Sequence, residues 1–173
     1  MSSDQLIAVA TDALRGLMQA AVPPATAVVV GPPSPEGEEL SGLSVHLYRI
    51  AVLPLVRAVP VLGNDGRRKR PELGLQLDYL ISGLGGEALE ELGLLGAALQ
   101  ALTDSPVRER QRLPELLSQP DRLSTVSPGT LTIQWRVLDM PADQMSGIWL
   151  ASRMRQRGGV FCRAEAVWQA VRE

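Results

Sequence analysis

Histidine, cysteine and aromatic residues are scarce in this chain, and their scarcity narrows what the protein can do. One histidine, His46, and one cysteine, Cys162, occur among 173 residues. A single cysteine cannot form an internal disulfide or a multi-cysteine metal site, which is compatible with a reducing cytoplasm. Aromatic residues make up only 3% of the sequence. Aliphatic side chains must therefore fill nearly all of the interior.

The sequence also lacks a strong net charge and a long hydrophobic run. It has 17 basic and 19 acidic residues, a net charge of −2, which gives no field strong enough to favour nucleic acid or an anionic membrane. No segment reaches the roughly 20 apolar residues that span a bilayer. Asp4, Gln5, Asp12 and Arg15 interrupt the first twenty residues, which therefore lack the apolar stretch of a secretory signal peptide. We expect a soluble protein with no signal peptide, no membrane insertion and no nucleic-acid partner.

The overall composition is that of a folded globular protein. Hydrophobic residues make up 45% and charged residues 21% of the chain, unlike the polar composition of disordered proteins. A length of 173 residues suits one domain with a continuous core. We expect a single domain that covers residues 1–173.

Apolar residues at helical spacing predict three main helices. The first covers about residues 4–20, the second about residues 87–103, and the third begins at Asp139 or Met140 and ends at Gly158-Gly159. The third helix presents an apolar face of Met145, Ile148 and Trp149. The second carries a leucine stripe along one side, formed by Leu89, Leu92, Leu95, Leu99 and Leu102.

Alternation of apolar and polar residues predicts the strands. They cover residues 27–31, 43–53, 73–82, 130–138 and 160–171, and the second and third should pair. The proline-rich stretch 104–129 is predicted to be irregular, with one short helical turn at residues 115–118. The fold class is therefore α+β: an antiparallel or mixed sheet of about five strands, with the three helices packed on one face. Its predicted core contains Leu75, Leu77, Tyr79, Leu95, Leu99, Ile133, Trp135 and Trp149.

No group of residues in the sequence has the pattern of a catalytic or metal site. His46 lies within an alternating strand and no Gly-x-Ser-x-Gly elbow accompanies it, so a serine triad is not predicted. Cys162 lies within the last strand and is interpreted as a structural thiol. The acidic pairs Glu38-Glu39 and Glu90-Glu91 are adjacent in sequence, and adjacent side chains point apart. We predict a non-enzymatic protein without a catalytic residue, a cofactor or a metal ion.

A glycine-rich segment lies between a predicted strand and a predicted helix. Residues 83–86 read Gly-Leu-Gly-Gly and stand where a phosphate-binding loop would. The segment matches neither the P-loop nor the dinucleotide-binding pattern. We interpret it as a turn that needs positive φ angles.

Two basic clusters remain. Arg153, Arg155 and Arg157 lie toward the end of the third predicted helix, where cations are favoured by the helix dipole. The other cluster follows an Asn-Asp-Gly turn between two paired strands, so it should project from a hairpin tip. No aromatic platform for nucleic-acid bases accompanies it, and it suits an acidic protein neighbour better. This predicted protein interface consists of Arg67, Arg68, Lys69 and Arg70.

Three segments together resemble a known family. They are Ser44–Ile50 with its Leu-Tyr-Arg, the strand Pro71–Ile81 with the pattern Pro-x-Leu-x-Leu-x-Leu-x-Tyr-Leu, and the helix Leu94–Leu102 followed by Ser105-Pro106-Val107. In this order they are similar to the N-terminal domain of the cap, or tube-terminating, protein of phage-tail-like contractile injection systems of the virulence-cassette and antifeeding-prophage type. The likeness spans nearly the whole chain. It departs at residues 158–162, where the family usually has a Pro-Ser and a tyrosine.

The resemblance implies a tail-terminator-like fold and a structural role. A cap of this kind forms a ring, typically a hexamer, at the distal end of the inner tube and sheath, ends their polymerisation and stabilises the particle. The implied partners are other copies of the chain, the inner tube protein and the sheath protein, and the implied location is the cytoplasm, where the particle assembles. Two alternatives stay open: a small-ligand-binding or enzymatic α+β domain with an unrecognised site, and a particle-associated adaptor.

Overall fold

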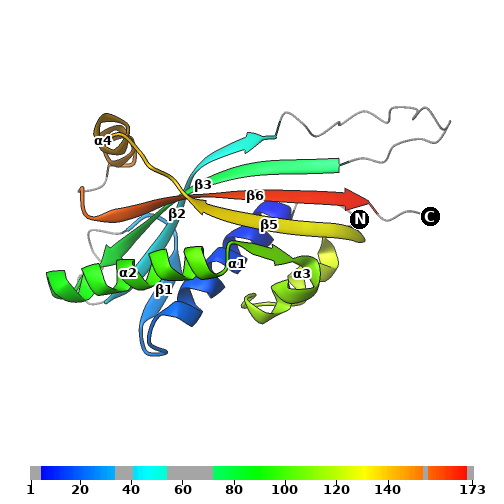
Figure 1. Ribbon diagram of the computed structural model, residues 1–173, viewed down its shortest axis with the longest axis horizontal. Coiled ribbons are helices and arrows are strands. Elements are labelled where there is room, and N and C mark those ends of the chain that lie inside the picture. Colours follow the sequence, from blue (N-terminus) through cyan, green and yellow to red (C-terminus); the bar gives the residue numbers. More distant parts are fainter. Residues whose placement is uncertain (1–4, 34–40, 54–71, 154–155, 171–173) are drawn as a thin grey trace.

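Six strands form one mixed sheet in the computed structural model, which describes residues 5–33, 41–53, 72–153 and 156–170 (Figure 1). The strand order is β1-β2-β3-β6-β5-β4. The strands are β1 (Ala27–Val30), β2 (Gly42–Val52), β3 (Glu72–Leu84), β4 (Val107–Glu109), β5 (Gly129–Val137) and β6 (Gly159–Ala170). The helices are α1 (Leu6–Ala21), α2 (Ala88–Asp104), the 3₁₀ helix η1 (Arg110–Glu115), the short α3 (Arg122–Thr125) and α4 (Ala142–Ala151). The predicted α+β class is confirmed.

The sheet is antiparallel except at one edge. β3 pairs with β2 and β6, and β5 pairs with β6 and β4, all antiparallel, whereas β1 pairs parallel with β2. The predicted pairing of residues 43–53 with 73–82 is confirmed. β4 raises the strand number from about five to six. Its three residues lie in the stretch that was predicted to be irregular, and a strand this short shows no readable alternation.

The main core lies between one face of the sheet and the helices α1 and α2. Leu75, Leu77, Tyr79 and Ile81 alternate along β3 toward this face and are buried, as the spacing predicts. Seven of the eight predicted core residues are buried. The prediction is wrong for Leu99, which is 40% exposed.

Leu99 is exposed because α2 is rotated relative to its leucine stripe. The buried face of α2 consists of Leu95, Ala98 and Leu102, whereas Leu89 and Leu92 are also exposed. The small alanine on this face lets α2 pack closely against α1 and the sheet. Alanine contributes little to a hydrophobic pattern, so the leucine stripe shares only Leu95 and Leu102 with the buried face and is offset from it.

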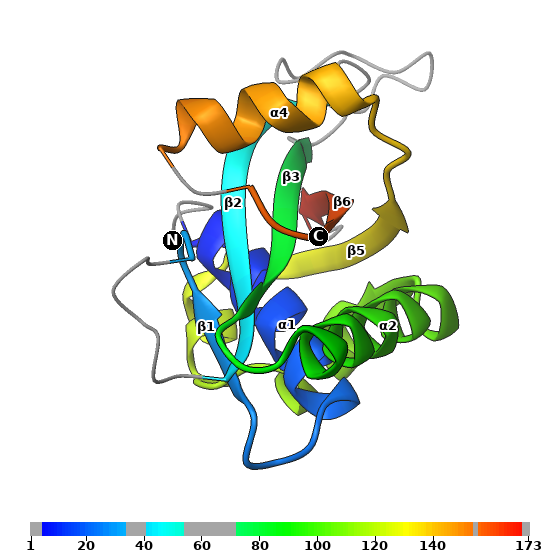
Figure 2. The ribbon, with the colours of Figure 1, turned by 90° about the vertical axis from the view of Figure 1, so that its left-hand side faces the viewer.

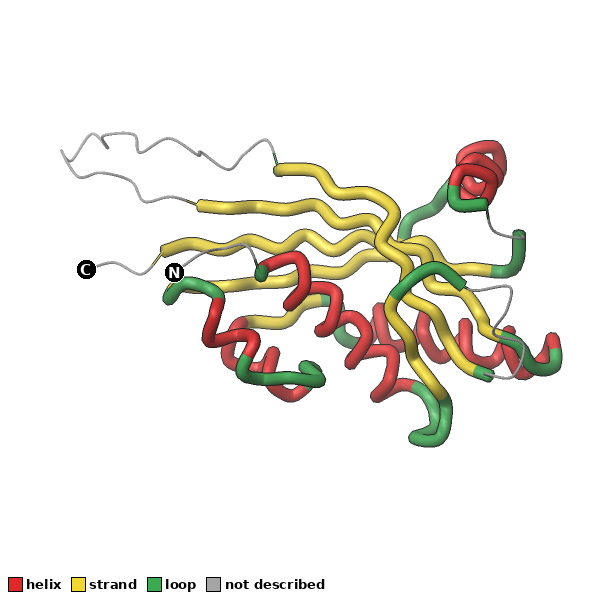
Figure 3. Tube along the Cα trace, turned by 180° about the vertical axis from the view of Figure 1, so that it is seen from behind, coloured by secondary structure: helices red, strands yellow, loops and turns green. Residues whose placement is uncertain are grey.

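α4 packs on the opposite face of the sheet from α1 and α2 (Figures 2 and 3). There Trp149 packs against Leu80 and Phe161 in a second apolar cluster, with Met145 and Ile148 beside it. Leu80 lies between Tyr79 and Ile81 on β3 and therefore points to the other face. The prediction that all helices cover one face is wrong for α4. A three-residue apolar stripe shows which side of a helix is buried, but it does not show which face of the sheet the helix covers.

Of two predicted turns, one differs in the structure and one is as expected. The expected helical turn at residues 115–118 is replaced by η1, which ends at Glu115, and by α3. The glycine turn is as predicted, because Gly85 and Gly86 have φ angles of 56° and 90° and connect β3 to α2.

A β-bulge at Tyr48 inverts the side-chain phase of β2. Leu47 is paired with Tyr79 and Arg49 with Asp78, so Tyr48 is the extra residue. The predicted alternation therefore fails beyond Tyr48. Arg49 lies on the α4 face of the sheet, and Ile50 and Val52 lie on the face that carries α1 and α2.

Candidate protein-interaction surface

The part of the α4 face that α4 leaves uncovered is polar. We define this polar face by six residues that lie on β2, β3, β5 and β6: Arg49, Gln76, Asp78, Arg136, Arg163 and Glu165. They alternate along the strands with residues of the main core. Antiparallel sheets commonly present such a hydrophilic face to water or to a partner.

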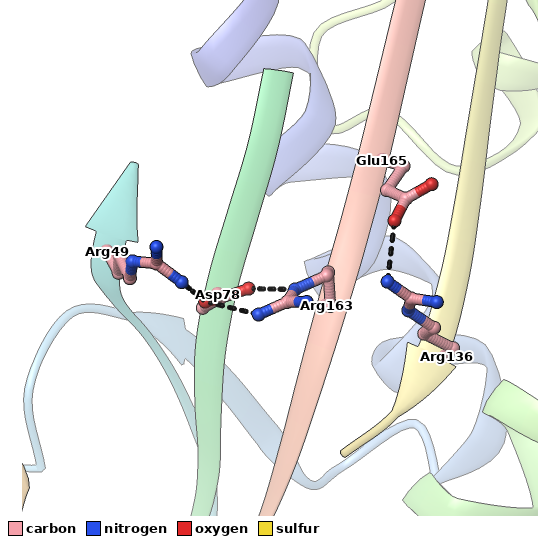
Figure 4. A network of polar contacts seen from close by, with 5 residues as sticks. All are labelled: Arg49, Asp78, Arg136, Arg163 and Glu165. Carbon is pink, nitrogen blue, oxygen red and sulfur yellow. Dashed lines mark hydrogen bonds and ion pairs between the residues drawn. The ribbon is translucent and has the colours of Figure 1, made fainter. Parts of the chain in front are cut away.

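Asp78 lies at the centre of the polar face and is only 2% exposed. Arg163 donates from Nε to Oδ1 at 2.6 Å and from Nη2 to Oδ2 at 3.0 Å, and Arg49 donates from Nη1 to Oδ2 at 3.2 Å (Figure 4). Burial raises the pKa of the Asp78 carboxyl, but the hydrogen bonds and charges of Arg163 and Arg49 outweigh it and hold this pKa below its ordinary value. The ionised carboxylate thus connects β2, β3 and β6.

Gln76 completes the contacts of these arginines. With its amide oxygen turned toward them, it accepts from Arg49 Nη1 at 3.2 Å and from Arg163 Nη2 at 3.1 Å. Both guanidinium groups are therefore held in fixed positions above the strands.

Two arginines face each other across neighbouring strands of the polar face. Arg136 on β5 is in register with Arg163 on β6, an arrangement that is destabilising for like charges without neutralising partners. Asp78 neutralises Arg163, and Glu165 accepts from Arg136 Nη2 at 2.7 Å. Three arginines and two carboxylates leave the polar face with a net charge of +1. The side chains of Arg49 and Arg136 remain more than half exposed and can contact a further anion.

A shallow hollow lies beside the polar face, between β2 and the end of α4. It has a volume of about 350 Å³ and is lined by His46, Leu47 and Tyr48 of β2 and by Ile148, Ala151 and Ser152 of α4. Burial lowers the pKa of His46, so its imidazole is neutral at pH 7. The Tyr48 ring contacts Phe161 edge to face, with centroids 6.0 Å apart. The lining offers one imidazole and two hydroxyls, from His46, Tyr48 and Ser152.

Cys162 is fully buried on the core side of β6, as a structural thiol should be. Burial raises the pKa of its thiol far above the ordinary value, so the reactive thiolate is suppressed. Within the described ranges, no three acidic, histidine or cysteine side chains are grouped so that they could hold a metal ion. In the same ranges, no helix is long and apolar enough to cross a membrane.

The predicted interface residues Arg67, Arg68, Lys69 and Arg70 lie outside the described residues, as do Arg155 and the pair Glu38-Glu39. The interface therefore stays a prediction. Sequence reasoning did not single out the network around Asp78. Its signal was present, since Asp78 occupies a polar position of an alternating strand, but the bulge at Tyr48 concealed that Arg49 lies opposite.

This arrangement of sheet and helices is found in proteins that terminate tubes. The fold is similar to the PVC sheath/tube terminator of an extracellular contractile injection system in its extended state, with a TM-score of 0.65 and 13% identity over 99% of this chain and 59% of that chain. It is also similar to the tube-terminating cap of the anti-feeding prophage, with a TM-score of 0.59 and 15% identity over 94% of this chain and 54% of that chain. This chain thus spans somewhat more than half of each of these proteins.

The sequence gives a more specific assignment. Residues 10–169 match the family described as the Pvc16 N-terminal domain, and the chain belongs to this family. The resemblance inferred from the sequence is confirmed. None of the curated proteins matches the chain.

Proposed function

We propose that the chain is a structural cap, or terminator, subunit of an extracellular-type contractile injection system. In this role it closes the distal end of the inner tube and sheath, ends their polymerisation and stabilises the particle. The observation that carries this proposal is membership of the Pvc16 N-terminal domain family over residues 10–169. The similarity in fold to a sheath/tube terminator and to a tube-terminating cap supports it.

The proposed partners are other copies of the chain in a ring, which we take to be a hexamer, together with the inner tube and sheath proteins. Residues 1–173 act as one domain, and the ring assembles on the particle in the cytoplasm. Arg67, Arg68, Lys69 and Arg70 contact an acidic surface of the tube, the sheath or a neighbouring cap subunit. The role needs no catalysis, in keeping with the buried thiol of Cys162, whose raised pKa suppresses the reactive thiolate.

Particle length tests the proposal directly. The tube and sheath proteins of the same particle are expressed in the presence and in the absence of the chain. The lengths of the assemblies are measured by electron microscopy. We expect capped particles of uniform length in the presence of the chain and a broad distribution of lengths in its absence. Identical length distributions would refute the terminator role.

The mass of the purified chain separates this proposal from a ligand-binding role. Size-exclusion chromatography with light scattering should give the mass of a ring. A stable monomer that carries a bound metabolite would favour a small-ligand-binding domain instead.

A further inference from the structure

β2 has an edge that its neighbours cover only in part. β1 pairs with β2 over Gly42–Val45, whereas β2 continues to Val52 and remains paired with β3 along its other side (Figure 3). On the side away from β3, the segment Leu47–Val52 has no strand partner among the residues that the structure describes. We call this segment the open edge.

The backbone of the open edge directs hydrogen-bonding groups outward. Val45 accepts a hydrogen bond from the Gly31 N–H at 3.0 Å on the outer side, whereas the Leu53 N–H donates to Gly74 at 2.9 Å on the β3 side. Successive residues of a strand alternate between the two sides, and the bulge at Tyr48 adds one step. The N–H and C=O groups of Leu47, Ile50 and Val52 therefore face away from β3. An unpaired edge of this kind is a template for another strand.

Apolar side chains accompany these outward backbone groups. Ile50 and Val52 lie on the face that carries α1 and α2 and are 53% and 65% exposed. Natural edge strands are protected by charged side chains, especially lysine, by proline or by a bulge. Of these devices the open edge has the bulge at Tyr48 and one cation, Arg49, which points to the other face, but it has neither lysine nor proline. Apolar side chains of an added strand would therefore bury most apolar surface if they lay on the same face as Ile50 and Val52.

The other face of the open edge favours an acidic side chain. Arg49 is more than half exposed, and its hydrogen bonds to Asp78 and Gln76 both come from Nη1, which leaves the N–H groups of Nε and Nη2 for a neighbour. Opposite charges in cross-strand register are stabilising. Beside this position, the hollow between β2 and α4 can receive one further side chain. An unpaired strand edge beside a side-chain pocket is what recognition of an extended peptide requires.

We propose that the open edge binds an extended segment of a partner protein by strand addition, and that this segment alternates apolar with acidic residues. Its apolar side chains lie beside Ile50 and Val52, and an acidic side chain pairs with Arg49. The proposal rests on the edge of β2 alone and holds whether or not the chain terminates a tube.

A synthetic peptide of alternating valine and glutamate tests the proposal. The labelled peptide is titrated with the full chain, and binding is followed by fluorescence anisotropy. In an antiparallel addition the valine amides would face β2, and in a parallel addition the glutamate amides would. We expect N-methylation of one of these two sets to weaken binding by at least about tenfold, whereas N-methylation of the other set has little effect.

Matched protein variants locate the binding surface. Ile50→Lys should weaken peptide binding, whereas Leu99→Lys, at an exposed apolar residue on α2, should not. A peptide with lysine in place of glutamate should bind the unaltered chain more weakly. Amide hydrogen exchange should slow at Leu47, Ile50 and Val52 when the valine–glutamate peptide is bound.

Four outcomes would overturn the proposal. They are no saturable binding up to about 1 mM peptide, equal effects of the two N-methylated peptides, equal effects of Ile50→Lys and Leu99→Lys, and protection of the Ile50 and Val52 amides in the free chain together with self-association. The last outcome would assign the open edge to a second copy of the chain.

Discussion

Asp78 is the residue on which the polar face depends, because its carboxylate is shared by Arg49 and Arg163. Asp78→Asn would keep the size of the side chain and remove its charge, which takes from the largely buried Arg163 the carboxylate to which it hydrogen-bonds. We expect the free energy of unfolding to fall by about 3 kcal/mol, the lower end of the cost of breaking a buried ion pair. Urea unfolding followed by circular dichroism measures this change.

The control for this substitution is Glu165→Gln, which removes the carboxylate from the exposed ion pair with Arg136. Exposed pairs contribute about 0–1 kcal/mol, so this variant should be almost as stable as the unaltered chain. Equal losses in the two variants would show that burial of Asp78 does not matter.

The carboxyl groups of Asp78 and Asp12 also predict how stability depends on pH. Burial raises the pKa of Asp12, but hydrogen bonds from Arg15 and Ser118 outweigh it and hold this pKa, like that of Asp78, below the ordinary value of 3.8. Each carboxyl therefore binds its proton less tightly in the folded than in the unfolded chain. Their stabilisation is fully present above pH 3.8 and is lost as the pH falls through the lowered pKa.

Urea unfolding at a series of pH values below neutrality should thus show a steep loss of stability in acid. Asp12→Asn should make this loss shallower, because only the carboxyl of Asp78 can then take up a proton on unfolding in acid. An unchanged slope in this variant would mean that the contacts of Asp12 with Arg15 and Ser118 contribute no pH-dependent stability.

At the level of secondary-structure elements, α2 provides a direct test of the packing. Leu95 is buried and Leu99, one turn further on, is 40% exposed. We expect Leu95→Ala to lower the free energy of unfolding by about 2–4 kcal/mol and Leu99→Ala by less than about 1 kcal/mol. Chemical denaturation of the two variants measures the difference. Equal losses would place the leucine stripe against the core, as its spacing alone suggested.

The elements also show how far the sequence determines the fold. The alternation along β3 identified its buried face correctly, because every second residue from Leu73 to Ile81 is apolar. The phase of β2 beyond Tyr48 could not be predicted, since a bulge depends on the partner strand rather than on the strand itself. The side of the sheet that α4 covers was equally hidden, because it depends on the tertiary path between β5 and β6. For the same reason, the network around Asp78 became visible only once strand register was known.

On the scale of the whole molecule, the predicted basic interface can be tested without its structure. Changing Arg67, Arg68, Lys69 and Arg70 to serine should weaken docking to the particle in a salt-dependent manner, because exposed charges act mainly on encounter and register. Thermal stability should remain almost unchanged. Capping frequency at several salt concentrations, with the melting temperature as the control, measures both effects. Normal capping by the quadruple variant would show that docking occurs elsewhere.

The thiol of Cys162 can report on local opening of the sheet. Its thiol lies in the middle of the sheet, in register with Tyr79 on one side and Val137 on the other, and it is the single thiol of the chain. A thiol-specific dye can react only after β6 has separated from a neighbour or from the helices that cover it. The labelling rate should therefore be very slow at neutral pH. Its comparison with the rate of global unfolding would show whether the sheet opens as one cooperative unit or whether β5 and β6 separate first.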